Sequence, residues 1–104
     1  MQSERWLSFL GLIRKAGKIS TGEQNTGKAV RQKKAKLIIL AEDASPNAAK
    51  RALSFAEASG CALVAVPADK NTLGEALGSS PFAMAAICDS GFADAFQRII
   101  NQSD

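Results

Sequence analysis

The chain contains no histidine and no tyrosine, and it has only two cysteines, three prolines and one tryptophan. Without histidine, the commonest general base and the usual catalytic triad are excluded. Cys61 and Cys88 lie far apart in the sequence, and neither has a neighbouring cysteine or histidine. This spacing offers neither a zinc site nor a redox CxxC motif. We therefore expect two buried, reduced thiols, no metal ion and no cofactor.

Long hydrophobic runs are also missing. The strongest run, LIIL at residues 37–40, is far shorter than the roughly 18 residues that cross a bilayer. The charged N-terminus lacks the apolar core of a signal peptide. We expect no membrane contact and a cytoplasmic location. The 104 residues, 46% of them hydrophobic, match the size of one domain around one core, so we expect residues 1–104 to form a single domain and a monomer.

Acidic residues are scarce in one part of the chain. Between residues 14 and 36, one acid, Glu23, stands against eight basic residues: Arg14, Lys15, Lys18, Lys28, Arg31, Lys33, Lys34 and Lys36. The whole chain has a net charge of only +3, so the remainder is net acidic. Local basicity of this kind indicates a docking face for a polyanion. The alternative is a solvated charged face with no partner.

The first part of the chain shows helical spacing. Four apolar residues recur on one face and predict a helix over about residues 4–16: Trp6, Leu7, Leu10 and Ile13. Ser3 can cap the start of this helix, and Gly17 can end it. We expect this apolar face, including the tryptophan, to pack in the core. A short extended piece around Ile19 follows.

A capping-box pattern, Thr21 with Gln24, predicts a second helix that runs to about Lys33. Its apolar side is thin and consists chiefly of Ala29 and Val30. Gly27 in the interior of this helix should cost about 0.8 to 1 kcal/mol relative to alanine. We expect tertiary packing to offset that cost.

The middle of the chain alternates between apolar runs and helical segments. KLIILA at residues 36–41 is an aliphatic run without polar alternation, which is typical of a strand covered on both faces. Ser45 then caps a helix that begins at Pro46, runs to about residue 59 and ends at Gly60. A second apolar strand, ALVAV at residues 62–66, is closed by Pro67.

The last part of the chain repeats this alternation. Thr72 and Glu75 form a capping-box pattern that predicts a short helix through Leu77, ended by Gly78. FAMAAIC at residues 82–88 is predicted to be a strand. Asp89 or Ser90 can cap a final helix that carries apolar residues inward: Phe92, Phe96, Ile99 and Ile100. Strands separated by helices predict an α/β fold, a three-layer α/β/α sandwich with a central, mostly four-stranded mixed sheet.

The start of the second helix has the features of a surface that reads nucleic acid. Free backbone N–H groups at a helix start carry partial positive charge and bind phosphate. The amides of Gln24 and Asn25 can pair with base edges, and Lys28 and Arg31 share one face of the helix. The alternative is that Thr21 and Gln24 only cap the helix.

Three segments then match one known family in order and spacing. GEQNTGKAVRQKKAKLIILAEDASP is followed by VPADKNTLGEALG and SSPFAMAAI. Together they resemble the L7Ae/L30e ribosomal protein superfamily, over roughly residues 4–100. The opening LGLIRKAGK is similar to the small bacterial YlxQ-type branch. The resemblance implies an α/β/α sandwich that binds kink-turn RNA without catalysing a reaction.

In that family the start of the second helix faces the sheared G·A pairs of the kink. The family's glycine falls on Gly22, its amide on Gln24, its acid on Asn25 and its lysine on Lys28. The common pattern is Asn-Glu where this chain has Gln24-Asn25. A neutral acceptor in place of the acid should weaken the contact to a guanine amino group by about 1 kcal/mol.

The resemblance also implies that a loop before the last strand covers an unstacked base. Five residues occupy this place: Ser80, Pro81, Phe82, Ala83 and Met84. The side chains of Phe82 and Met84 either pack on that base or enter the core as strand residues.

The candidate RNA contacts in the basic window are Lys18, Gly22, Glu23, Gln24, Asn25, Lys28, Arg31 and Lys36.

Glu42 and Asp43 follow the KLIILA strand and are the only candidates for a paired-carboxylate catalytic site. They precede Ser45-Pro46, where a helix N-terminus stabilises negative charge, so we expect a structural role. In the family this corner adjoins the RNA, and both residues are secondary candidates for RNA contact. No further acid or metal-ligand cluster accompanies the pair, and neither a GxGxxG nor a P-loop signature is present. An enzyme is the least favoured class.

Two hypotheses remain from the sequence. The first is a non-catalytic RNA-binding protein that recognises a kinked or internal-loop RNA, associated with the ribosome or with the transcription or translation machinery. The second is a protein-interaction module on the same fold, suggested by the altered Gln24-Asn25 motif and by the net acidic second half of the chain. A purified protein that carries nucleic acid removable by high salt would favour the first hypothesis.

Overall fold

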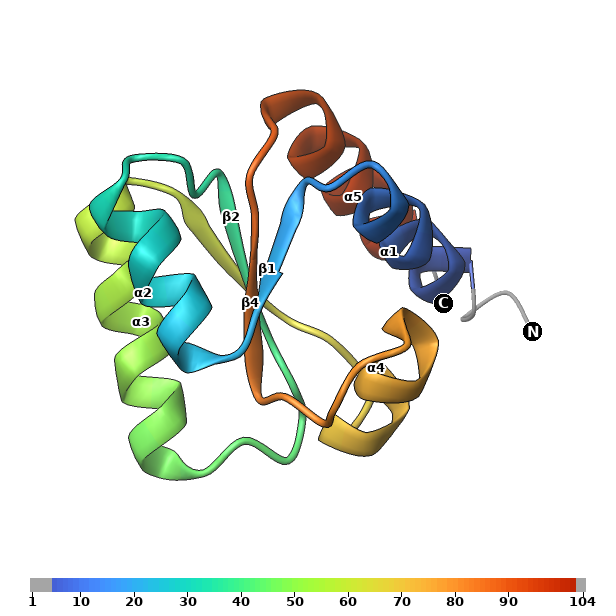
Figure 1. The fold of residues 1–104 in the computed structure, drawn as a ribbon, viewed down its shortest axis with the longest axis horizontal. Helices are drawn as coiled ribbons and strands as arrows, with labels where there is room; N and C mark the ends of the chain where they lie inside the picture. Colours follow the sequence, from blue (N-terminus) through green and yellow to red (C-terminus); the bar gives the residue numbers. More distant parts are fainter. Residues whose placement is uncertain (1–4, 103–104) are drawn as a thin grey trace.

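The computed structural model describes residues 5–102 (Figure 1). Helices and strands alternate along this part of the chain. The order is α1 (Arg5–Lys15), β1 (Ile19–Thr21), α2 (Glu23–Arg31), β2 (Leu37–Leu40), α3 (Pro46–Ser59), β3 (Ala62–Ala65), α4 (Lys70–Leu77), β4 (Met84–Ile87) and α5 (Ser90–Gln102). The predicted Ser3 cap lies outside the described residues.

The four strands form one mixed sheet in the order β1-β4-β2-β3. β4 is antiparallel to both of its neighbours, and β2 is parallel to β3. Helices α2 and α3 cover one face of the sheet, and α1, α4 and α5 cover the other (Figure 1). The predicted three-layer α/β/α sandwich with a four-stranded mixed sheet is therefore confirmed.

Side chains of the two central strands alternate between two cores. In β2, Leu37 and Ile39 face the core under α1, α4 and α5, and Ile38 faces the core under α2 and α3. The strand is covered on both faces, as the aliphatic run predicts. The ring of Trp6 packs edge-to-face on Phe96, with centroids 6.3 Å apart, so both aromatic side chains belong to the larger core. The predicted core role of the tryptophan is confirmed.

Several helix boundaries follow from local capping chemistry. The N–H of Ala48 donates to Oγ of Ser45 at 3.1 Å, and the N–H of Phe92 donates to Oδ2 of Asp89 at 2.9 Å. These bonds satisfy free donors in the first turns of α3 and α5. Gly60 and Gly78 end α3 and α4 in the left-handed conformation. All four boundary residues were predicted from the sequence, and Asp89 is the cap of α5.

Both predicted capping boxes are wrong. Thr21 is the last residue of β1, where it pairs with Ala85, so α2 starts two residues later, after Gly22 and without a side-chain cap. In α4 the cap is Asp69, whose Oδ1 accepts from the N–H of Thr72 at 2.7 Å. Sheet pairing in one case and a stronger local acceptor in the other decide these helix starts.

Gly27 lies where α2 and α3 come closest. A Cβ atom at this position would lie 3.2 Å from Cζ of Phe55. The missing side chain allows the two helices to pack closely, and this packing offsets the low helix propensity of glycine. Beyond Ala29, the buried residues of α2 are Thr26 and Gly27, while Val30 is only partly buried.

The two cysteines are free, as expected, but they are half-buried rather than buried. Burial is the main cause that raises the pKa of the Cys61 thiol, so this thiol is protonated at neutral pH. Within residues 5–102, no group of three or more His, Cys, Asp or Glu side chains could hold a metal ion. None of the described helices is both long and apolar enough to cross a membrane.

Candidate nucleic-acid interface

Two backbone hydrogen bonds gather three distant segments at one end of the sheet. The N–H of Gly22 donates to the carbonyl oxygen of Met84 at 2.8 Å, and the N–H of Ala41 donates to that of Ala83 at 2.7 Å. The start of α2, the exit of β2 and the loop before β4 therefore meet. We call residues 22–25, 41–45 and 79–83 the loop end of the sheet; it lies at the bottom of Figure 1.

The first turn of α2 is exposed at the loop end. Gly22 precedes the helix with φ 91° and ψ 161°, and no side chain caps the free N–H groups. Gln24 and Asn25 are exposed. Nδ2 of Asn25 donates to the carbonyl oxygen of Thr21 at 2.9 Å, so its Oδ1 is available as an acceptor. The sequence-predicted amides thus face solvent beside free backbone donors.

One face of α2 continues this surface. Gln24, Lys28 and Arg31 line a shallow pocket of about 390 Å³ together with Arg51 and Phe55 of α3. Cζ of Arg51 lies 5.4 Å from the centre of the Phe55 ring, which is within the range of a cation–π contact. Three cations therefore surround one pocket next to the predicted amides.

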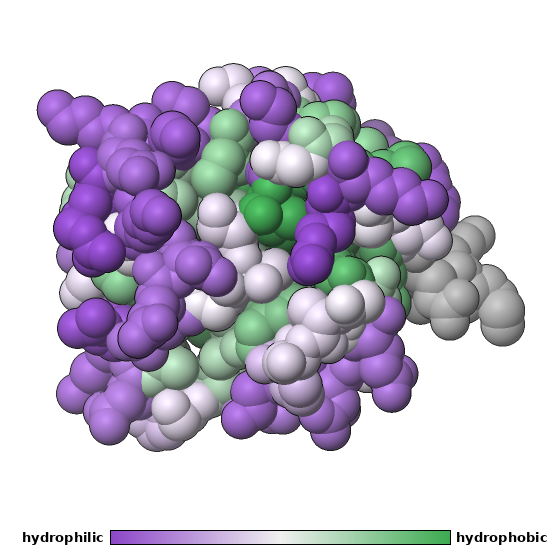
Figure 2. Space-filling model, viewed as in Figure 1, coloured by the Kyte–Doolittle hydropathy of each residue, from purple (hydrophilic) through white to green (hydrophobic). Residues whose placement is uncertain are grey.

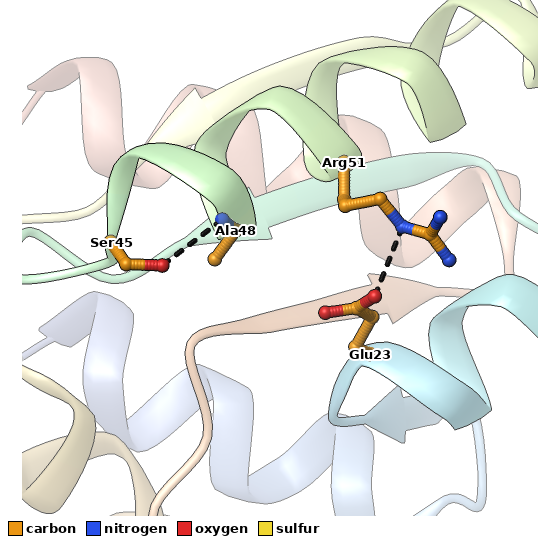
Figure 3. Close-up of polar contacts among 4 residues, drawn as sticks. All are labelled: Glu23, Ser45, Ala48 and Arg51. Atoms are coloured by element: carbon orange, nitrogen blue, oxygen red, sulfur yellow. Dashed lines mark hydrogen bonds and ion pairs between the residues drawn. The ribbon is translucent and has the colours of Figure 1, made fainter.

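Glu23 forms an ion pair across the two helices. Its Oε2 lies 3.0 Å from Nε of Arg51, and the two side chains are 47% and 59% exposed (Figure 3). A pair this exposed contributes at most about 1 kcal/mol to stability. The acid does have an electrostatic effect on the surface, because it offsets the charge of Arg51 and stands at the positive end of α2.

Helix α3 supplies a part of this surface that was not predicted from the sequence. A second pocket of about 550 Å³ adjoins the first; Glu23 and Arg51 line both, and Lys50 lines the second. The available signal was the basic pair Lys50-Arg51 in the first half of a predicted helix, with Phe55 four residues after Arg51. Without the packing of α3 on α2, nothing connected this pair to the basic window.

The loop before β4 presents backbone and small side chains, not its large ones. Ser80 and Pro81 are exposed and Ala83 is partly exposed. Phe82 and Met84 are only 6% and 1% exposed and lie in the two cores. Of the two roles considered for these side chains, the core role is confirmed. Phe82 is therefore not available to cover an unstacked base.

Glu42 and Asp43 are exposed at the exit of β2. Oδ1 of Asp43 accepts from the N–H of Lys70 at 3.0 Å, and the N–H of Glu42 donates to the carbonyl oxygen of Ala68 at 2.9 Å. The helix start that Asp43 serves is that of α4, whereas Ser45 caps α3. The structural role is thus confirmed for the side chain of Asp43, at α4 rather than at the predicted helix α3, whereas Glu42 is bonded only through its backbone N–H.

Lys18 and Lys36 lie at the opposite end of the sheet. The N–H of Cys88 donates to the carbonyl oxygen of Lys18, and the N–H of Lys36 donates to that of Ile87, both at 2.8 Å. The two lysines therefore flank the end of β4, whereas Gly22 contacts its beginning. The expected single docking face is divided between two ends of the molecule.

The surface over α2 and α3 is strongly hydrophilic. Figure 2 shows hydrophilic side chains gathered over these helices, at the left of the view, while apolar and neutral side chains occupy the middle of the face around β1. The same two helices supply the side chains that line the pocket of about 390 Å³: Gln24, Lys28 and Arg31 from α2 and Arg51 from α3. A polar, cationic surface fits an anionic partner better than an apolar one.

With this fold and surface described, the chain can be compared with known proteins. Residues 4–97 match the ribosomal protein L7Ae/L30e/S12e/Gadd45 family. The chain belongs to this family. RNA-binding protein YlxQ from Bacillus subtilis (strain 168) is 35% identical over 98 residues, which cover 90% of this chain and 93% of that protein. The resemblance inferred from the sequence motifs is thereby confirmed.

Other similar proteins extend the comparison. Large ribosomal subunit protein eL8 from Cenarchaeum symbiosum (strain A) is 35% identical over 97 residues, covering 92% of this chain and 74% of that protein. A Bacillus halodurans C protein of unknown function superposes with a TM-score of 0.85 at 30% identity, over 94% of this chain and 98% of that chain. The Giardia lamblia 15.5kD RNA binding protein superposes with a TM-score of 0.76 at 26% identity, over 98% and 87%.

Proposed function

We propose that this chain binds structured RNA and recognises a kinked or internal-loop conformation through the loop end of the sheet. The observation that carries the proposal is that the exposed amides of Gln24 and Asn25 lie beside the loop of residues 79–83. The bonds from Gly22 to Met84 and from Ala41 to Ala83 hold the start of α2 beside residues 79–83. Relatives named as RNA-binding and ribosomal proteins support RNA as the ligand.

The residues of the loop end have separate roles in this proposal. Free N–H groups at the start of α2 and the amides of Gln24 and Asn25 contact base edges. Lys28 and Arg31, one and two turns further along the helix, contact phosphates. The exposed residues Ser80 and Pro81 cover the other side of the bound nucleotide. Binding to this geometry stabilises the bent RNA, because a ligand that prefers one conformation shifts the population toward it.

Asn25 tunes the strength of this recognition. Its Nδ2 is held by the carbonyl oxygen of Thr21, so the carbonyl side of the amide faces outward and can accept from a guanine amino group. A neutral acceptor makes a weaker hydrogen bond than a carboxylate, by about 1 kcal/mol. We expect recognition of kinked RNA with moderate affinity.

We further propose that the protein acts as a non-catalytic RNA-binding component of the translation or transcription machinery. The ribosomal relative, eL8, supports this assignment. No group on the described surface combines a nucleophile with a base, so binding is the chemistry that the loop end supports.

The test compares a kink-turn RNA with a fully paired duplex of equal length at several salt concentrations. We expect tighter binding to the kinked RNA and a steep loss of affinity with salt. Gln24→Ala and Asn25→Ala should erode the preference, whereas Lys28→Ala should weaken binding to both RNAs. Asn101→Ala, which removes an exposed amide in α5, is the matched control. Equal affinity of the wild-type protein for both RNAs would remove the specificity claim.

Failure to bind either RNA at low salt would favour the protein-interaction module. The ultraviolet absorbance ratio of the purified protein, before and after a high-salt wash, gives an independent reading of bound nucleic acid. Unchanged selectivity in both amide variants, with binding intact, would move the recognition surface away from the start of α2.

A further inference from the structure

Most of the basic window lies away from the loop end. Lys18 and Lys36 of this window flank the end of β4. The last turn of α1 and the turn after α2 lie at the same end of the sheet, at the top of Figure 1. We call the six exposed cations of this end the basic rim: Arg14, Lys15, Lys18, Lys33, Lys34 and Lys36. Only Lys28 and Arg31 of the basic window remain on the face of α2 next to the amides.

Sheet pairing fixes the spacing of the rim. Ile19 and Leu37 both pair with Ile87, from opposite sides. The lysines that precede them, Lys18 and Lys36, are therefore two strand spacings apart, about 10 Å at the backbone. The sheet therefore fixes the backbone spacing of these two lysines, while their exposed side chains can adapt to a partner.

Lys33 occupies a conformation that favours glycine. It has φ 61° and is the one non-glycine residue with positive φ in the described chain. Its N–H donates to the carbonyl oxygen of Val30 at 3.0 Å, and the N–H of Lys34 donates to that of Ala29 at 2.9 Å. This is the Schellman arrangement, in which glycine usually occupies the position of Lys33. Glycine would occupy this position without strain; the lysine found here instead adds a cation to the rim.

The rim charges have no ion-pair partners in residues 5–102. Three acids lie near this end of the fold: Glu57 in α3, Asp94 in α5, and Asp89 immediately before α5. Asp89 is engaged with the N–H of Phe92, and Asp94 shares a hollow of about 280 Å³ with Lys36. Cations near the C-terminus of α2 also stabilise that helix. That effect accounts for Lys33 and Lys34, but not for Lys18 and Lys36, which belong to no helix.

We propose that the basic rim is a second RNA-binding surface, which contacts the phosphates of a paired RNA segment without reading its sequence. The inference rests on the proposed function only in taking RNA as the polyanion. The rim and the loop end lie at opposite ends of the sheet, and α2, about 13 Å long, runs between them. An RNA that is recognised by shape at the loop end can therefore continue along the protein and contact the rim by charge.

The test uses a fully paired RNA duplex, which lacks the feature that the loop end recognises. Lys33→Ala combined with Lys36→Ala removes two rim charges, and Arg5→Ala combined with Arg98→Ala removes two exposed charges elsewhere. We expect the rim pair to weaken duplex binding and to lower the slope of log affinity against log salt by about 2. The control pair should leave both nearly unchanged. Equal losses in the two pairs would overturn the proposal in favour of a general net-charge effect.

A second comparison separates the rim from the loop end. The rim pair should keep the preference for kinked over paired RNA, and Gln24→Ala should keep the affinity for the duplex. If the wild-type protein shows no preference for kinked RNA, the proposed function fails. The rim proposal is then still supported if the rim pair weakens binding to the duplex. If Gln24→Ala and Lys28→Ala abolish duplex binding and the rim pair does not, the rim proposal fails. Binding of the rim to vesicles of anionic phospholipid, but not to duplex, would also overturn it.

Lys33 allows charge and strain to be separated. Lys33→Ala removes the charge and keeps a Cβ at positive φ, whereas Lys33→Gly removes both. We expect the same loss of duplex affinity from the two variants, and a higher stability for Lys33→Gly than for Lys33→Ala. Wild-type duplex affinity in both variants would show that the strained residue has no part in RNA binding.

Discussion

The backbone N–H of Gly22 donates to the carbonyl oxygen of Met84 at 2.8 Å, so the residue that precedes α2 is fastened to the first residue of β4. This single bond aligns the exposed first turn of α2 with the loop before β4. The geometry requires φ 91° and ψ 161° at Gly22, a region that only glycine occupies without strain.

Gly22→Ala should therefore damage both the fold and the interface. A Cβ atom meets no neighbour there, so the cost comes from backbone strain and should be about 1 to 3 kcal/mol. We expect that loss in chemical denaturation, together with weaker binding of kinked RNA. Gly60→Ala, at φ 67° at the other end of the sheet, beside Lys36 of the rim, is the control: it should lose stability and keep the preference for kinked over paired RNA. Unchanged RNA binding in Gly22→Ala would show that the turn tolerates reorientation.

Gly74→Ala tests whether the loop before β4 must be held in place. A Cβ at residue 74 would lie 2.8 Å from the carbonyl oxygen of Ser80 and 2.9 Å from the nitrogen of Pro81. Because both atoms belong to the backbone, the loop must move, at a cost of about 1 to 3 kcal/mol. We expect lower stability by urea denaturation and a reduced preference for kinked RNA.

Gly11→Ala is the matched control for that variant. Its Cβ would lie 3.7 Å from the carbonyl oxygen of Ala76, an ordinary contact. This glycine is in the interior of α1, so alanine should raise stability by about 0.5 to 1 kcal/mol and leave RNA binding unchanged. A stability gain in Gly74→Ala as well would mean that the loop yields without strain.

The central strands were predictable from the sequence because burial on both faces leaves an unambiguous pattern. LIIL and MAAI contain no polar residue, and their side chains alternate between two cores. The two capping boxes failed for different reasons: a tertiary contact decides the start of α2, and Asp69, a stronger local acceptor, decides the start of α4. Thr21 is used by the sheet, through its pairing with Ala85, and no local pattern in the sequence contains that pairing.

The candidate interface was predictable only where its residues are close in sequence. Gln24, Asn25, Lys28 and Arg31 belong to one helix, so their shared exposure follows from helical spacing. Arg51 lines the pocket beside α2 because α3 packs closely against α2 at Gly27. The separation of Lys18 and Lys36 from this site depends on the position of β4 between β1 and β2. Strand order of this kind is not encoded in any short segment.

The cap of α4 predicts a dependence of stability on pH. The hydrogen bond from the backbone N–H of Thr72, and then that from its side chain, lowers the pKa of Asp69 below its ordinary value of 3.8. A lowered pKa in the folded state means that ionised Asp69 stabilises the protein above pH 4 or so. This contribution is lost as the pH falls through the folded pKa.

Asp69→Asn keeps a capping oxygen but cannot ionise. We expect the variant to be less stable than the wild type at pH 7 and pH 5, by the same amount, and the difference to shrink at pH 3. Urea denaturation at the three pH values measures it. A difference that stays constant down to pH 3 would mean that the charge of Asp69 contributes nothing to the cap.

Glu23 should oppose RNA binding. It is the one acid on the exposed face at the start of α2, and its ion pair holds Arg51 within 3.0 Å. An RNA phosphate approaching this surface meets the repulsion of the carboxylate and competes with it for Arg51. Glu23→Gln removes the charge and keeps the shape, so we expect RNA affinity to rise by up to about fivefold, which corresponds to an exposed pair of about 1 kcal/mol.

The stability of Glu23→Gln should change little, because both partners of the ion pair are largely exposed. The decisive measurement is a double-mutant cycle on RNA affinity with Arg51→Ala. If Glu23 acts by occupying Arg51, Glu23→Gln should raise affinity in the wild-type background and raise it less when Arg51 is absent. An equal gain in both backgrounds would assign the effect to direct repulsion of phosphate. A loss of affinity in Glu23→Gln would instead show that its carboxylate accepts a hydrogen bond from the RNA, in the role proposed above for the amide oxygen of Asn25.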